Sequence, residues 1–198
     1  MTYAVIGSGA IGSAIARLFA RKGIDLFVAN SRGPASLDDL IAELGPSINA
    51  VSVPDAARAD VIILAVPFTA VPEAVRDMPT WAGRIVVDAT NAIDFPAFTP
   101  KDLGGRPSTE IVAEAVPGAR VVKAFNTLPA AILAADPAQD GGRRILFVSG
   151  DNTPANAEIA KLIERLGFAS ITLGKLAEGG RLQQFGAPLV AQNLTKHV

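Results

Sequence analysis

The 198-residue chain has no cysteine and only one histidine, one tyrosine and one tryptophan. Without cysteine it can form no disulfide, no thiolate metal site and no thiol nucleophile. The only histidine, His197, lies next to the carboxyl end, where we expect disordered surface. The remaining metal-binding side chains are scattered carboxylates, so we expect neither a metal site nor metal-dependent catalysis.

Charge and long apolar runs are also scarce. Charged residues make up 19% of the chain and nearly cancel, which leaves a net charge of −1. We therefore expect no nucleic acid and no anionic membrane as a partner. No stretch approaches the ~20 apolar residues that a membrane helix needs. The first apolar run begins at Tyr3, so no signal peptide is expected, and the sequence predicts a soluble cytoplasmic protein.

The most informative feature that is present is a glycine-rich turn. An apolar run from Tyr3 to Ile6 stops at Gly7, Gly9 and Gly12, and a helical period follows from Ser13 to Arg21. This strand, turn and helix form the context of a dinucleotide-binding G-x-G-x-x-G. Its glycines allow a tight turn, the approach of a pyrophosphate and close helix packing, with the diphosphate on the helix N-terminus. The alternative is a glycine turn in a fold without nucleotide.

The next strand indicates which nucleotide binds. Asp25-Leu-Phe-Val-Ala ends at Asn30, about where an NAD site carries an acidic residue on the ribose 2′-hydroxyl. Ser31 and Arg32 follow instead, and a hydroxyl beside a guanidinium suits a 2′-phosphate. The alternative is a solvated Ser-Arg-Gly-Pro turn, and both interpretations can hold together. We therefore predict NADP(H) in preference to NAD(H).

Strand and helix patterns alternate along the rest of the chain. They predict a Rossmann-type, doubly wound α/β fold with a mostly parallel sheet of about seven to eight strands and a C-terminal helical segment. Residues 1–174 would form the NADP-binding domain, and residues 175–198 a helical appendage rather than an independent domain. The expected strands are 3–6, 25–29, 49–53, 60–66, 84–90, 120–125, 143–149 and 169–173. The expected helices are 13–21, 36–44, 70–77, 108–116 (capped by Ser108), 153–166 and a last segment over 175–195.

Groups that could exchange a proton with a substrate are few. A dehydrogenase acting on an alcohol, ketone or imine normally needs such a group. Tyr3 lies at the bottom of the first strand, and Lys123 is expected to span apolar surface with its ammonium in water. Asp88 either caps a turn or belongs to the site. We therefore name no catalytic residue and expect a hydride acceptor that is itself a cofactor ring, a flavin or deazaflavin.

Polar residues follow two of the expected strands at the ligand-binding edge of the sheet. Asn91, Asn126 and Thr127 are suited to holding the ribose or carboxamide of the nicotinamide. Residues 92–107 are rich in proline and glycine and include Phe95 and Phe98. We expect them to form a long loop near the site.

Several motifs together resemble the NADPH-dependent deazaflavin (coenzyme F-420) reductase family, whose relatives include the cytosolic oxidoreductase domains of membrane metalloreductases. The motifs cover almost the whole chain: Val5-Ile-Gly-Ser-Gly-Ala-Ile-Gly12, Asn30-Ser-Arg32, Val87-Asp-Ala-Thr-Asn91, Val122-Lys-Ala-Phe-Asn-Thr127, Gly180-Arg-Leu, Gly186-Ala-Pro-Leu and Asn193-Leu. The resemblance implies hydride transfer between NADPH and a deazaflavin or flavin. It also implies that Ser31 and Arg32 grip the 2′-phosphate and that residues 124–129 face the nicotinamide and the acceptor.

Two departures from the family leave the acceptor open. Asn126 stands where archaeal deazaflavin reductases carry a histidine, and Thr90-Asn-Ala stands where relatives have Thr-Asn-Pro. A flavin, a quinone-like ring or a chelated metal could replace the deazaflavin. Two other functions stay in view: a small imine or ketone reductase using Lys123, and a non-catalytic NADP(H)-sensing module.

The patterns and the resemblance together define a set of expected cofactor-binding residues. They are Gly7, Ser8, Gly9, Ala10, Ile11, Gly12, Asn30, Ser31, Arg32, Ala65, Val66, Pro67, Asn91, Ala124, Asn126 and Thr127.

The last expected helix also suggests an assembly. Leu182, Phe185 and Leu189, with Asn193, recur at helical spacing, and the polar residues between them are mostly amides. Amides are less costly to desolvate at an interface than charges. We therefore predict a homodimer with Phe185 and Leu189 in its interface; the alternative is that this face covers the chain's own sheet.

Overall fold

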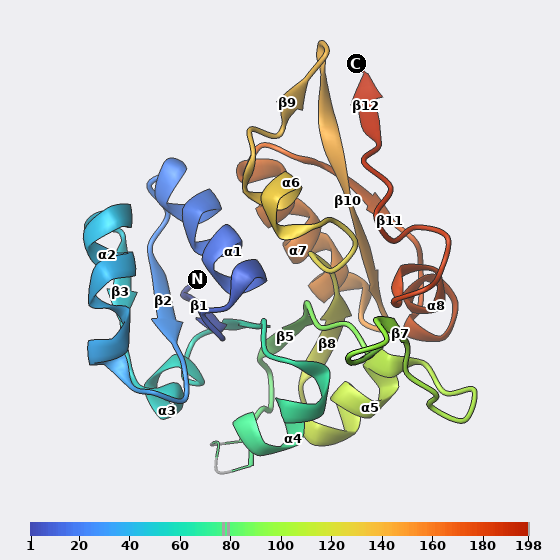
Figure 1. Cartoon of the computed structure of the whole chain (residues 1–198), viewed down its shortest axis with the longest axis horizontal. Helices are drawn as coiled ribbons and strands as arrows, with labels where there is room; N and C mark the ends of the chain where they lie inside the picture. Colours follow the sequence, from blue (N-terminus) through green and yellow to red (C-terminus); the bar gives the residue numbers. More distant parts are fainter. Residues whose placement is uncertain (77, 79, 198) are drawn as a thin grey trace.

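The computed structural model describes residues 1–76, 78 and 80–197. Its main sheet has the strand order β11-β10-β8-β5-β4-β1-β2-β3, with the short strands β9 and β12 paired to β10 (Figure 1). Neighbouring strands from β3 to β8 are parallel, and β10 runs antiparallel to β8. The strands are β1 Tyr3–Ile6, β2 Leu26–Ala29, β3 Ile48–Ala50, β4 Val61–Leu64, β5 Ile85–Asp88, β8 Arg120–Lys123, β9 Ala138–Gln139, β10 Gly142–Gly150, β11 Ala169–Thr172 and β12 Thr195–His197. The predicted doubly wound, mostly parallel fold is confirmed.

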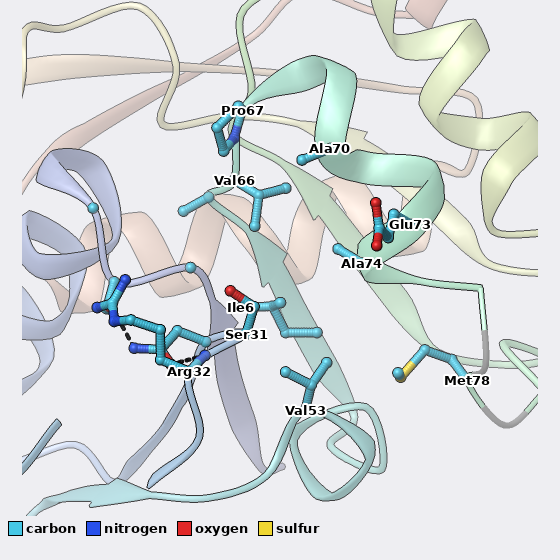
Figure 2. Close-up of a pocket in the computed structure, with 15 residues that line it drawn as sticks. Ile6, Ser31, Arg32, Val53, Val66, Pro67, Ala70, Glu73, Ala74 and Met78 are labelled. Carbon is cyan, nitrogen blue, oxygen red and sulfur yellow. Dashed lines mark hydrogen bonds between the residues drawn. The ribbon is translucent and has the colours of Figure 1, made fainter. Parts of the chain in front are cut away.

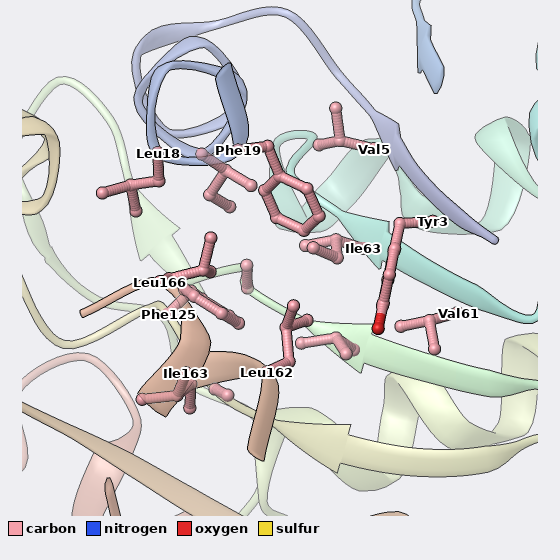
Figure 3. Close-up of a cluster of buried hydrophobic side chains, with 14 of the residues drawn as sticks. Tyr3, Val5, Leu18, Phe19, Val61, Ile63, Phe125, Leu162, Ile163 and Leu166 are labelled. Carbon is pink, nitrogen blue, oxygen red and sulfur yellow. The ribbon is translucent and has the colours of Figure 1, made fainter. Parts of the chain in front are cut away.

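Helices cover both faces of this sheet, as the unbroken apolar runs of β4 and β5 require. Side chains alternate along β1: Tyr3 and Val5 join the core under α1 and α7, whereas Ala4 and Ile6 join the core on the opposite face. Figure 3 shows part of the first core, to which Phe19 of α1 and Leu162 of α7 both contribute side chains. The helices are α1 Ala10–Arg21, α2 Asp38–Leu44, α3 Val53–Ala56, α4 Val71–Ala74, α5 Ser108–Ala115, α6 Ala130–Ala134 and α7 Thr153–Arg165.

Several of the expected boundaries differ from those observed. The strand expected over 49–53 ends at Ala50, because the Ser52 side chain accepts a hydrogen bond from the Asp55 N–H and starts α3 at Val53. The helix expected over 70–77 is a 3₁₀ turn, Phe68–Ala70, followed by α4; Asp77 lies outside the described residues. The expected loop over 92–107 contains a small hairpin of β6 Ile93–Asp94 and β7 Thr99–Pro100.

Ser108 does not cap α5. Extended Pro107 occupies the cap position, and Ser108 is the first helical residue. Its buried hydroxyl has no hydrogen-bond partner within the described part of the chain. The helix was predicted correctly, but its cap lies one residue earlier than expected, at Pro107.

The C-terminal helical segment is present but much shorter than expected. A π-helical turn, Leu176–Gly180, leads into α8, Arg181–Gln183, after which the chain turns. Gly186 has a φ of +86° and Pro188 has no N–H to donate, so a helix cannot continue through them. His197, expected to be disordered, pairs with Gly142 in β12.

The shorter helix removes the face on which the dimer prediction rested. Leu189 packs instead against Ile145 and Phe147 of the chain's own sheet, and Phe185 contacts Phe98. The dimer itself stays a prediction. None of the helices in the described residues is long and apolar enough to cross a membrane.

Candidate functional site

The glycine turn between β1 and α1 combines two crowded glycines with an open one. Gly7 has a φ of +113°, and a side chain there would collide with the carbonyl of Ala65 at the end of β4. A side chain at Gly12 would collide with the carbonyl oxygen of Gly7. At Gly9, by contrast, a Cβ would meet no atom of the described residues within 4 Å. The turn is therefore closed on its protein side and open on the side where α1 presents its first N–H groups.

Asn30 organises the turn that follows β2. Its side chain is 7% exposed, and its Nδ2 donates to the hydroxyls of Ser8 (2.9 Å) and Ser36 (3.0 Å). Its Oδ1 accepts from the backbone N–H of Arg32 (2.8 Å). One guanidinium nitrogen of Arg32 lies 3.4 Å from the Ser8 hydroxyl. The glycine turn and the Ser31–Arg32 turn are thus held together by one network, with Ser31 and Arg32 exposed above it.

These two turns open onto a cavity of about 650 Å³. In Figure 2, Arg32 and Glu73 lie on opposite sides of the cavity, with Val66 and Ile6 between them. The predicted residues that line it are Gly7, Ser8, Gly9, Asn30, Ser31, Arg32, Ala65, Val66 and Pro67. The remaining predicted residues of the glycine turn, Ala10, Ile11 and Gly12, form the first turn of α1.

Six further residues line the cavity that the sequence did not indicate. They are Ile6, Val53, Ala70, Glu73, Ala74 and Met78. Val53 was predicted to lie in a strand, and Ala70 to Ala74 in the helix expected over 70–77, so neither pattern suggested a pocket. Their position in the chain could have indicated the pocket. Both segments follow strands at the carboxyl edge of a parallel sheet, where ligands bind in such folds.

The predicted residues after β5 and β8 lie outside this cavity and form a separate amide cluster on the same edge. Asn91 Nδ2 donates to the backbone carbonyl of Asn126 (2.9 Å), and Asn126 Nδ2 donates back to Asn91 Oδ1 (3.0 Å). Asn126 also donates to the carbonyl of Gln183 (2.6 Å). The other two predicted residues here, Ala124 and Thr127, are buried beside Asn126.

Two acceptors of the amide cluster are unused. Asn126 Oδ1 and Gln183 Oε1 are buried and have no partner among the described residues. A buried acceptor without a donor is costly, so such a group calls for water or a bound donor. Gln183 belongs to α8, and no sequence pattern pointed to it.

Lys123 does not reach water, contrary to the expectation. Its side chain and that of Asp88 are both 0% exposed, and Nζ lies 2.9 Å from Oδ2. Nζ also donates to the backbone carbonyl of Thr90 (3.1 Å). The ammonium and the carboxylate meet inside the protein because Asp88 and Lys123 are register partners on the adjacent strands β5 and β8.

Asp88 both caps the turn after β5 and holds the ion pair. Oδ1 accepts from the N–H (2.9 Å) and the hydroxyl (2.6 Å) of Thr90, and Oδ2 also accepts from the hydroxyl of Thr109 (2.8 Å). Burial by itself raises the pKa of Asp88. The Lys123 ammonium and these hydrogen bonds outweigh burial and hold the pKa below its ordinary value.

Other polar chemistry lies away from this edge. The Tyr3 hydroxyl accepts a hydrogen bond from the exposed Arg165 of α7 (3.1 Å). Across the described ranges, no three His, Cys, Asp or Glu side chains gather as metal ligands. This edge of the sheet thus carries the glycine turn, the cavity, the amide cluster and the turn of Ser31 and Arg32, which we call the cationic turn.

Known proteins resemble the chain at several levels. Residues 2–92 match the family model described as NADP oxidoreductase, coenzyme F420-dependent. A hypothetical protein from Sinorhizobium meliloti is 59% identical, with 99% of this chain and 96% of that chain covered and a TM-score of 0.96. A protein from Arthrobacter sp. FB24, assigned as an F420-dependent NADP-reductase, is 28% identical, with coverages of 89% and 86% and a TM-score of 0.74.

A longer curated protein is also similar. Metalloreductase STEAP3 of Rattus norvegicus is 28% identical over 182 residues, which are 90% of this chain and 35% of that protein. The chain spans little more than a third of the length of the curated relatives it matches.

Proposed function

Because residues 2–92 match the family model of coenzyme F420-dependent NADP oxidoreductases, we propose that the chain transfers a hydride between NADPH and a deazaflavin or flavin. The resemblance inferred from the motifs is confirmed at the level of the family. The ring acceptor and the roles of individual residues are our proposal.

The cationic turn is the single observation that carries the choice of nucleotide. Asn30 stands where NAD sites have an acidic residue, and its carboxamide is already bonded to Ser8, Ser36 and Arg32. The position therefore repels no phosphate. The exposed hydroxyl of Ser31 and guanidinium of Arg32 bind the 2′-phosphate through charge-assisted hydrogen bonds.

The remaining parts of NADPH follow the edge of the sheet from this turn. The diphosphate lies on the open side of Gly9, against the first N–H groups of α1. Apolar Val53, Ala70 and Ala74 of the cavity wall suit the adenine. The nicotinamide lies toward Asn91 and Asn126, where the unused Oδ1 of Asn126 can accept from the carboxamide.

A ring acceptor fits the amide cluster, because its described side chains, Asn91, Asn126 and Gln183, include no acid that could donate a proton. Reduction moves one hydride from NADPH to the ring, and the second hydrogen of the reduced ring enters as a proton from water. No side chain must supply that proton. A small imine or ketone reductase using Lys123 has less support, because the ammonium is wholly buried between Asp88 and Thr90.

The test is anaerobic stopped-flow oxidation of NADPH by the protein. The acceptors are a deazaflavin, flavin mononucleotide, flavin adenine dinucleotide, a quinone and a ferric chelate. We expect rapid oxidation with the deazaflavin or a flavin. Preference for the quinone or ferric chelate would replace the proposed acceptor, as would turnover of a cyclic imine in a parallel assay. Tight NADPH binding without oxidation by any acceptor would identify a sensing module.

A further inference from the structure

Two exposed phenylalanines and a half-buried one form a cluster beside the amide cluster. The ring centroids of Phe95 and Phe98 are 5.8 Å apart, and those of Phe98 and Phe185 are 5.2 Å apart, both edge to face. Phe95 is 72% exposed and Phe98 is 61% exposed. We call Phe95, Phe98 and Phe185 the aromatic ledge. Exposed apolar groups of this kind commonly mark binding sites rather than ordinary surface.

The ledge is built from two segments that are fixed to one another. Phe95 and Phe98 lie in the turn of the β6–β7 hairpin, whose base is closed by the hydrogen bond from Lys101 N to Ala92 O (3.0 Å). Phe185 comes from the chain that leaves α8. Gly186 packs directly on Pro100 of β7, so closely that a side chain at Gly186 would collide with the proline ring. Figure 1 shows β7 and α8 near each other at this side of the sheet.

Short connections join the ledge to the predicted nicotinamide end of the site. Asn91 precedes the hairpin by two residues, and it is paired with Asn126 (3.0 Å). Asn126 in turn donates to the carbonyl of Gln183 (2.6 Å), two residues before Phe185. The amide cluster therefore lies next to the start of the β6–β7 hairpin and next to Gln183, from which the two segments of the aromatic ledge extend.

We propose that the aromatic ledge binds the planar ring of the hydride acceptor, and this inference rests on the proposed function. Hydride transfer requires the two rings to approach to about 3–3.5 Å, so the acceptor must bind next to the nicotinamide. Rings packed edge to face leave ring surface available for stacking by a further planar ring. Covering the ledge with that ring also removes water from the transfer site.

The test compares Phe95→Ala and Phe98→Ala with wild type, using flavin mononucleotide and a deazaflavin as acceptors. We expect the KM for the acceptor to rise about tenfold, as for loss of an aromatic stacking partner. The NADPH dissociation constant should stay within twofold, because the cavity is untouched. Phe98→Tyr keeps an aromatic ring and should restore the acceptor KM. Phe27→Ala, at a phenylalanine of β2 that is 36% exposed, is the matched control.

The outcomes separate this proposal from the one on which it rests. Wild-type turnover with unchanged acceptor KM in both variants would overturn the ledge and leave the proposed function standing. Absence of wild-type turnover with any acceptor would overturn both. A second copy of the chain is the rival occupant, so sedimentation is measured in parallel. A wild-type dimer that Phe98→Ala converts to monomer would assign the ledge to an interface between copies and overturn its acceptor role.

Discussion

The ammonium of Lys123 and the carboxylate of Asp88 form an ion pair of 2.9 Å that has no contact with solvent. The pair joins β5 to β8 directly before the two turns that carry Asn91 and Asn126. Hydrogen bonds from Thr90 and Thr109 complete the shell of Asp88. The pair thus stabilises the backbone from which the amide cluster projects.

Removing one partner of this pair should destabilise the fold strongly. Lys123→Met leaves a buried carboxylate uncompensated, at a cost of about 3–5 kcal/mol. Urea titration followed by circular dichroism measures the free energy of unfolding. The double variant Lys123→Met with Asp88→Leu removes both charges and should recover part of the loss. A single variant as stable as wild type would contradict the structural role of the pair.

The same pair predicts a decline of stability in acid. The folded pKa of Asp88 is lowered from its ordinary value of 3.8. Its contribution is therefore present above that ordinary value and is lost as the pH falls through the lower folded pKa. Unfolding free energies measured from pH 7 down to pH 2 should fall less steeply at the acid end in Asp88→Asn than in wild type. Parallel curves would show that Asp88 does not contribute to the acid transition.

Arg32→Ala should weaken binding of NADPH specifically. Loss of charge-assisted hydrogen bonds to a 2′-phosphate costs about 2 kcal/mol, or roughly thirtyfold in Kd. NADH binding should barely change, since NADH has no 2′-phosphate. Fluorescence titration with both nucleotides measures the difference. Arg58→Ala, at a side chain 74% exposed and outside the cavity, is the control. Equal losses for both nucleotides would refute the role of Arg32.

Two glycine variants should fail for different reasons. Gly9→Val should abolish NADPH binding in a folded protein, because a side chain at Gly9 meets open space where the diphosphate binds. Gly12→Val should unfold or strongly destabilise the chain, because its side chain meets the carbonyl of Gly7. Circular dichroism and NADPH titration separate the two effects. A folded Gly9→Val variant with wild-type affinity would show that the nucleotide binds elsewhere.

The sequence alone determined the fold class of the nucleotide half, through its alternating strands and helices, and the turns at the edge of its sheet. The apolar run of β1, the glycines after it and the period of α1 are local patterns, and so are the turn residues Asn30 to Arg32. Local patterns suffice here because a parallel sheet with short connections brings the carboxyl ends of its strands to one edge.

Only the tertiary structure decided which side chains are enclosed and what the C-terminal chain does. Lys123 is buried because its register partner on β5 happens to be Asp88, a pairing that no spacing along the chain reveals. The apolar residues after Gln183 repeat at helical spacing, yet Gly186 turns against Pro100 and Leu189 packs on the sheet. Burial and ion pairing depend on residues distant in the chain, so they are properties of the folded packing and not of any local pattern.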